Sequence, residues 1–111
     1  MNRVVCNSGP LIALGILGHI DVLRSLFDEV LVPDAVQGEI AQGGLKFLGV
    51  EAFRRAGWIR VLRPERKNEL LAALLDDGEA AVIDLAREQG IELVLIDERK
   101  ARKIARDIYG L

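Results

Sequence analysis

Residues 3–17 read RVVCNSGPLIALGIL, and their pattern of a strand followed by a helix recurs along the chain. The short β-branched run at residues 3–6 is typical of a buried strand. A turn follows at residues 7–10, and Pro10 suits the first turn of the helix that we expect over residues 11–17. A buried strand therefore leads through a polar turn into a helix.

The same alternation continues along the chain. Further strands are expected at residues 30–32, 58–62 and 93–96, and helices at residues 19–27, 34–40, 50–56, 65–75, 79–89 and 98–109. Apolar strand runs separated by helices imply parallel pairing with helices on both faces. We therefore predict one α/β domain over residues 1–111, built on a parallel sheet of at least four strands.

Composition excludes several classes of protein. Half of the 111 residues are apolar and 29% are charged, which argues against disorder and low complexity. A single cysteine excludes an intramolecular disulfide framework and a multi-cysteine zinc site, and a single histidine excludes histidine-rich metal chemistry. Cys6 is expected to pack as a small apolar group. No stretch is apolar enough to span a membrane or to act as a signal peptide, so we expect a cytoplasmic protein without a membrane partner.

The net charge of −2 is unevenly distributed. Residues 68–97 hold eight acids and one base, whereas residues 54–67 hold six bases and one acid, and residues 98–111 hold five bases and two acids. Such blocks can simply be solvated faces. They are also the pattern of a site that gathers carboxylates and flanks them with cations, as a phosphodiester-handling site would.

Four polar residues follow or neighbour the predicted strands. Asn7 and Asp97 close the first and last strands, and Glu39 and Glu79 lie in nearby helices. Ligands of open parallel sheets bind outside the carboxyl ends of the strands, so these side chains can share one edge. Converging carboxylates repel one another unless protons or cations neutralise them. An oxygen-only set of ligands selects Mg²⁺ or Mn²⁺.

Each of these residues also has a purely local explanation. Asp97 is a good N-cap for the last helix, and Asp76 with Glu79 fits a capping box. Asn7 suits an Asx turn, and Glu39 suits an exposed helical position. Spacing alone leaves both interpretations open.

Four segments together resemble the PIN domain family, most closely its VapC-like bacterial and archaeal branch. They are residues 4–14 (VVCNSGPLIAL), 30–40 (VLVPDAVQGEI), 75–83 (LDDGEAAVI) and 93–102 (LVLIDERKAR). The resemblance covers nearly the whole chain, and the order of the four segments makes it far more specific than any one motif.

The resemblance implies a three-layer fold and a Mg²⁺- or Mn²⁺-dependent ribonuclease, often a toxin opposed by a cognate antitoxin. The family's four acidic positions fall on Asn7, Glu39, Glu79 and Asp97, of which the three carboxylates are expected to hold the metal. Expected substrate contacts are Ser8, Arg99, Lys100, Arg102 and Lys103. RNA, an antitoxin protein and a second copy in a homodimer are the expected partners.

Two departures from the family pattern keep alternatives open. The first acidic position is the neutral Asn7, which favours a second hypothesis of an inactive PIN-like module that binds RNA or a protein. The chain also stops at Leu111, where the family usually adds a strand and a helix, so we expect a truncated chain or a short member with a partner-covered edge. A receiver-like phosphoacceptor domain is disfavoured, because residues 62–64 (LRP) follow the third strand without an aspartate.

Overall fold

The computed structural model describes residues 2–42, 47–96, 99, 103, 106, 107, 110 and 111. The strands are β1 (Arg3–Cys6), β2 (Glu29–Pro33), β3 (Ile59–Leu62) and β4 (Leu93–Leu95). The helices are α1 (Ser8–Ile16), α2 (Asp21–Leu26), α3 (Asp34–Ala41), α4 (Phe47–Arg55), α5 (Glu69–Leu74) and α6 (Asp77–Gln89).

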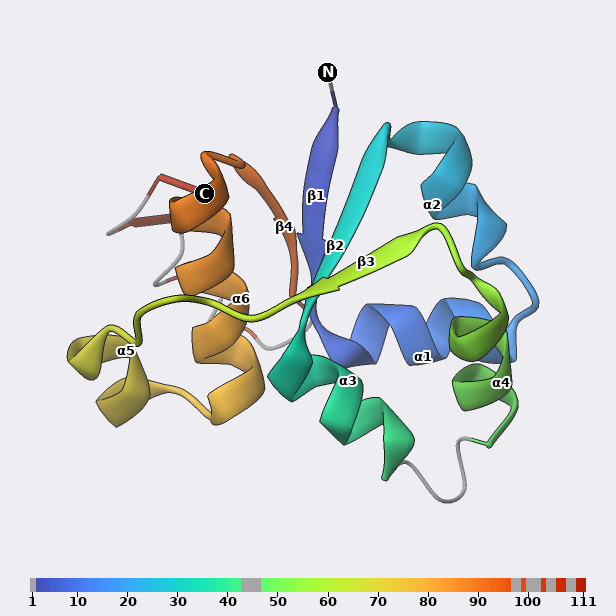
Figure 1. The fold of residues 1–111 in the computed structure, drawn as a ribbon, viewed down its shortest axis with the longest axis horizontal. Helices are drawn as coiled ribbons and strands as arrows, with labels where there is room; N and C mark the ends of the chain where they lie inside the picture. The colour runs from blue at the N-terminus through green and yellow to red at the C-terminus, as the bar shows by residue number, and fades with distance from the viewer. Residues whose placement is uncertain (1, 43–46, 97–98, 100–102, 104–105, 108–109) are drawn as a thin grey trace.

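The strands form one parallel sheet in the order β3-β2-β1-β4. Val4 of β1 pairs with Val30 of β2 on one side and with Leu93 of β4 on the other. Figure 1 shows α6 on one side of the strands and α1, α2 and α4 on the other, with α3 beyond the carboxyl ends of the strands. The predicted fold class, a parallel α/β sheet with helices on both faces, is confirmed.

The core is built on the two central strands, β1 and β2. Val4, Val5 and Leu31 are completely buried, since helices cover both faces of the sheet. Helix α6 contributes its apolar side to the same core through Val82 and Ile83. The carboxyl ends of β1 and β2 are therefore supported by a tightly packed core.

Several helix boundaries differ from the sequence prediction, among them the starts of α1 and α5. Helix α1 begins at Ser8, in the segment predicted as a turn, and α5 begins at Glu69 rather than at residue 65. The backbone N–H groups of Glu65 and Arg66 donate to the Glu88 carboxylate, each at 2.9 Å. The side chain of Asn68 then accepts from the N–H groups that open α5, so the helix begins at Glu69.

The predicted last helix, residues 98–109, lies largely outside the described residues. None of the helices in the described ranges is long and apolar enough to cross a membrane.

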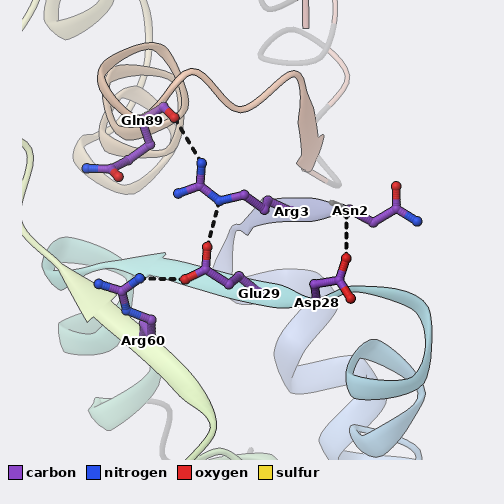
Figure 2. A network of polar contacts seen from close by, with 6 residues as sticks. All are labelled: Asn2, Arg3, Asp28, Glu29, Arg60 and Gln89. Carbon is purple, nitrogen blue, oxygen red and sulfur yellow. Dashed lines mark hydrogen bonds and ion pairs between the residues drawn. The ribbon is translucent and has the colours of Figure 1, made fainter.

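The amino ends of the strands are joined by an ion-pair network, which we call the amino-edge network (Arg3, Glu29 and Arg60). Glu29 accepts from Arg60 Nη1 at 2.5 Å and from Arg3 Nε at 2.7 Å (Figure 2). Arg3 also donates to the carbonyl of Gln89 at 3.1 Å. The hydrogen bond from Arg60, with that from Arg3, lowers the pKa of Glu29 against the opposing effect of desolvation. One carboxylate thus links three strands.

Candidate active site

Asn7 lies where β1 ends and α1 begins. Its backbone N–H donates to the carbonyl of Leu95 in β4 at 2.9 Å, which ties this point to the end of the neighbouring strand. Its side-chain oxygen accepts from the N–H of Ser8 at 2.9 Å and caps α1. Only 5% of Asn7 is exposed. Pro10, in the first turn of the helix, has no N–H that would need an acceptor. Asn7 therefore holds its side-chain oxygen in a fixed position at the carboxyl ends of the strands.

Glu39 reaches the same edge from α3. The hydroxyl of Ser8 donates to Glu39 Oε2 at 2.8 Å, which connects the start of α1 to the second half of α3. Helix α3 starts immediately after β2, with Asp34 following Pro33, so the end of the strand fixes the place of the helix. Glu39 is thereby held beside Ser8, the residue that follows Asn7, although 31 residues separate Ser8 from Glu39.

The Glu39 carboxylate lies against Gly78, at the start of α6. A Cβ atom built on Gly78 would be 2.1 Å from Glu39 Oε1 and 2.8 Å from its Cδ, so only a glycine permits this approach. The next residue is Glu79, the other predicted helical carboxylate. The structure thus brings Glu39 to the residue that precedes Glu79.

Glu79 is buried, with 7% of its surface exposed. Its Oε1 accepts from the backbone N–H of Asp76 at 3.2 Å, while Asp76 Oδ1 accepts from the N–H of Glu79 at 2.8 Å. This reciprocal pair is the capping box predicted from the sequence. The amino-terminal end of α6 also favours negative charge through the helix dipole. Both Glu79 and the neighbouring Glu39 lie where that effect is felt.

The described residues thus gather Asn7, Ser8, Glu39 and Glu79 around one edge, and we call these four the candidate site. Asp97, the fourth predicted acidic-position residue, lies outside the described residues. Among the residues that the structure describes, no group of three or more acidic, histidine or cysteine side chains is placed to hold a metal ion. The three-carboxylate cluster therefore stays a prediction.

Comparison with protein families supports the same interpretation. A family model described as a PIN domain matches residues 3–109, which is nearly the whole chain. The protein belongs to the PIN domain family. A search of curated proteins gives no match.

PIN domains are typically nucleases that use divalent metal ions, so the family implies nuclease chemistry for this chain. The side-chain oxygens of the candidate site are suitable ligands for such an ion. An amide oxygen and two carboxylates offer only oxygens, and hard cations prefer oxygen ligands. The absence of a side chain at Gly78 keeps the Glu39 carboxylate at the start of α6, next to Glu79.

Cysteine chemistry does not compete with this interpretation of the PIN domain. Cys6, directly before Asn7, is buried, and desolvation raises the pKa of its thiol to about 12. The thiolate that a nucleophile needs is therefore not formed near neutral pH. Cys6 packs in the core of the sheet, as its sequence context predicts.

The predicted phosphate contacts are described only in part. Arg99 and Lys103 are exposed. Lys100 and Arg102 lie outside the described residues. Ser8, predicted to contact substrate, donates its hydroxyl to Glu39 at 2.8 Å, and its contact with substrate stays a prediction.

Sequence reasoning missed two features of this region. The sequence prediction places Gly78 between the helices expected over residues 65–75 and 79–89, yet Gly78 lies in α6 and contacts the Glu39 carboxylate. A glycine between two predicted helices is an ordinary break in the chain, so the sequence carried no signal of this contact. The second feature is Asp84, 6% exposed, whose signal was one acid within the apolar run of residues 80–86.

Proposed function

We propose that this PIN domain is a Mg²⁺- or Mn²⁺-dependent endoribonuclease with Asn7, Glu39, Glu79 and Asp97 as its catalytic residues. The observation that carries the proposal is the contact of the Glu39 carboxylate with Gly78, directly before the buried Glu79. Neither a solvated helix face nor a helix cap requires that approach. A site that gathers carboxylates gives this approach a reason.

Glu39, Glu79 and Asp97 would hold the metal, and Asn7 would orient a water or the substrate. When bound, the divalent ion lowers the pKa of a water molecule and stabilises charge on the scissile phosphate. Ser8 positions Glu39 through its hydroxyl, and Asp76 positions Glu79 through the capping box. Arg99, Lys100, Arg102 and Lys103 are the proposed contacts to the RNA phosphates.

A second candidate is an inactive PIN-like module that binds RNA or a protein partner. The observation in its favour is that Asn7 is neutral and that its side-chain oxygen already accepts the N–H of Ser8 as a helix cap. An amide oxygen has two lone pairs, so one acceptor position remains, but Asn7 adds no charge to the site.

RNA cleavage by the purified chain in Mn²⁺ tests the first proposal. We expect cleavage that disappears with a chelator and falls by about 100-fold or more in Glu39→Gln, the order of loss when a metal site is disturbed. Glu92→Gln, an exposed acid before β4, is the matched control and should retain activity. Activity that survives both the chelator and Glu39→Gln would contradict the proposal.

Asn7→Asp separates the two candidates. If the native chain is inert and Asn7→Asp gains both metal binding and cleavage, the inactive module is correct. If the native chain already cleaves RNA, the nuclease proposal stands.

We further propose that the protein acts on RNA in the cytoplasm as the toxin of a toxin–antitoxin pair, as a homodimer bound by its antitoxin. Support comes from the resemblance to the VapC-like branch. Induced expression should arrest growth, and Glu39→Gln should relieve the arrest. Light scattering of the purified chain measures the oligomeric state.

A further inference from the structure

A cavity of about 220 Å³ lies beside the candidate site, between α3, α6 and the connection from β3 to α5. Asp34 and Ala35 line it from α3, Arg63 and Lys67 from the connection, and Ala81 and Asp84 from α6. None of these residues belongs to the candidate site.

The cavity and the candidate site share two helices. Ala35 lies four residues before Glu39 on α3, which is about 6 Å along the helix axis. On α6, Asp77 lines the cavity and directly precedes Gly78, the residue that contacts Glu39. A chain that crosses the candidate site can therefore place a neighbouring group in the cavity.

Asp84 gives the cavity lining a buried acceptor. The residue is 6% exposed, and its two carboxylate oxygens share the N–H of Asn68 at 3.3 and 3.4 Å. A carboxylate offers about four acceptor positions, so acceptors remain for a ligand. Desolvation raises the pKa of Asp84, partly opposed by the hydrogen bond from Asn68. Donors from a ligand would offset that desolvation.

The other residues that line the cavity differ in chemistry from Asp84. Alanines at positions 35, 72, 80 and 81 leave an apolar space, and its volume is below the ~300 Å³ of the smallest common ligand pockets. Arg63 is on the rim with 85% of its side chain exposed, 4.0 Å from Asp34, and Lys67 is also exposed. Small apolar walls with cations at the mouth suit a single base whose phosphate stays outside.

We propose that this cavity binds one nucleobase of single-stranded RNA that flanks the cleaved phosphodiester. The base carries an exocyclic amino group, which donates to Asp84, while Arg63 and Lys67 contact the adjacent phosphate. Guanine, cytosine and adenine carry such a group and uracil does not. Carboxylates read amino groups on bases in this way. The inference rests on the proposed function, because it takes RNA as the substrate.

The test measures binding in the presence of a chelator, so that no cleavage is needed. Labelled pentanucleotides UUUUU, UUCUU, UUAUU and UUGUU are titrated by fluorescence anisotropy. We expect the three that carry an amino-bearing base to bind about 5-fold or more tightly than UUUUU, the lower end of discrimination by a good base contact. Equal affinity for all four would overturn the proposal.

Two variants assign the discrimination to the cavity. Ala81→Leu fills it and should remove the preference, whereas Ala73→Leu, on α5 away from the cavity lining, should retain it. Asp84→Asn replaces one acceptor oxygen with an amino donor and should weaken the preference; its thermal unfolding is compared with that of the native chain. A preference that survives Ala81→Leu would overturn the proposal even if Asp84→Asn fails to fold.

The two cations at the mouth of the cavity, Arg63 and Lys67, allow a separate prediction. Arg63→Gln and Lys67→Gln should each reduce the slope of log affinity against log salt by about 0.7 for a single strand, without changing the base preference. An unchanged slope would remove these residues from the proposal. Base discrimination with no effect of Glu39→Gln on cleavage would refute the proposed function alone, and cleavage without discrimination would refute the cavity alone.

Discussion

The carboxylates at the two ends of the parallel sheet have different kinds of hydrogen-bond partner. At the amino ends, Glu29 lies between the guanidinium groups of Arg3 and Arg60 (Figure 2). At the carboxyl ends, Glu39 accepts from the hydroxyl of Ser8 and Glu79 accepts from the backbone of Asp76. An arginine neutralises a carboxylate, whereas a hydroxyl or an N–H only orients it. The first arrangement links strands, and the second preserves negative charge that a cation can use.

The largest effect that separates the two ends is expected from Gly78→Ala. The new Cβ would displace the Glu39 carboxylate, and a displacement of about 1 Å in a catalytic group can cost about 100-fold in rate. Stability should change by no more than about 1 kcal/mol, because the displaced atoms end a flexible side chain and alanine favours the helix. Cleavage rates and urea unfolding measure the two effects.

Gly38→Ala is the matched control for that prediction. Gly38 is also helical, and a Cβ there would meet no atom within 4 Å. Full activity in Gly38→Ala together with full activity in Gly78→Ala would mean that the position of Glu39 does not matter.

Ser8→Ala should have the next largest effect. Losing the 2.8 Å hydrogen bond frees the Glu39 carboxylate, and loss of such a supporting partner costs about 10-fold in activity or metal affinity. Ser8→Thr keeps the hydroxyl and should restore much of the activity. If Ser8→Ala raises KM for RNA and leaves metal affinity unchanged, Ser8 contacts substrate instead.

Removing the cap of α6 should affect both stability and activity. Asp76→Ala should lower the free energy of unfolding by about 1 kcal/mol, as the loss of an N-cap does. Activity should fall less than in Ser8→Ala, since Glu79 remains buried. Asn68→Ala, which removes the N-cap of α5, should cost similar stability and leave cleavage unchanged. Equal losses of cleavage in both variants would show a general effect of unfolding.

The smallest effect on activity is expected at the amino-edge network. Glu29→Gln should leave cleavage unchanged and slightly lower stability at neutral pH. Because the folded-state pKa of Glu29 is lowered, its contribution is present above the ordinary glutamate pKa of ~4.3 and is lost as pH falls through the folded value. Urea unfolding of both proteins between pH 3 and 7 should show curves that converge at the acidic end.

The sequence was most informative where burial alone decides the structure. The β-branched runs of residues 3–6 and 30–32 predicted two strands that are buried on both faces, and the capping box at Asp76 and Glu79 was predicted from four adjacent residues. It failed where a distant group intervened. Residues 65–66, predicted as helical, precede the N-cap of α5, and their N–H groups donate to the distant Glu88, a contact that local propensity cannot register. Leu26, an apolar residue of the helix predicted over residues 19–27, is 59% exposed.

The sequence by itself determined that the chain is a parallel α/β protein and that polar residues follow its strands, because strand burial and helix caps are local patterns. Only the tertiary structure decided that Glu39 lies against Gly78, and that Asp84 lines a cavity beside that contact. Both depend on how α3 packs against α6, and the sequence spacing within either helix carries no information on the distance between them.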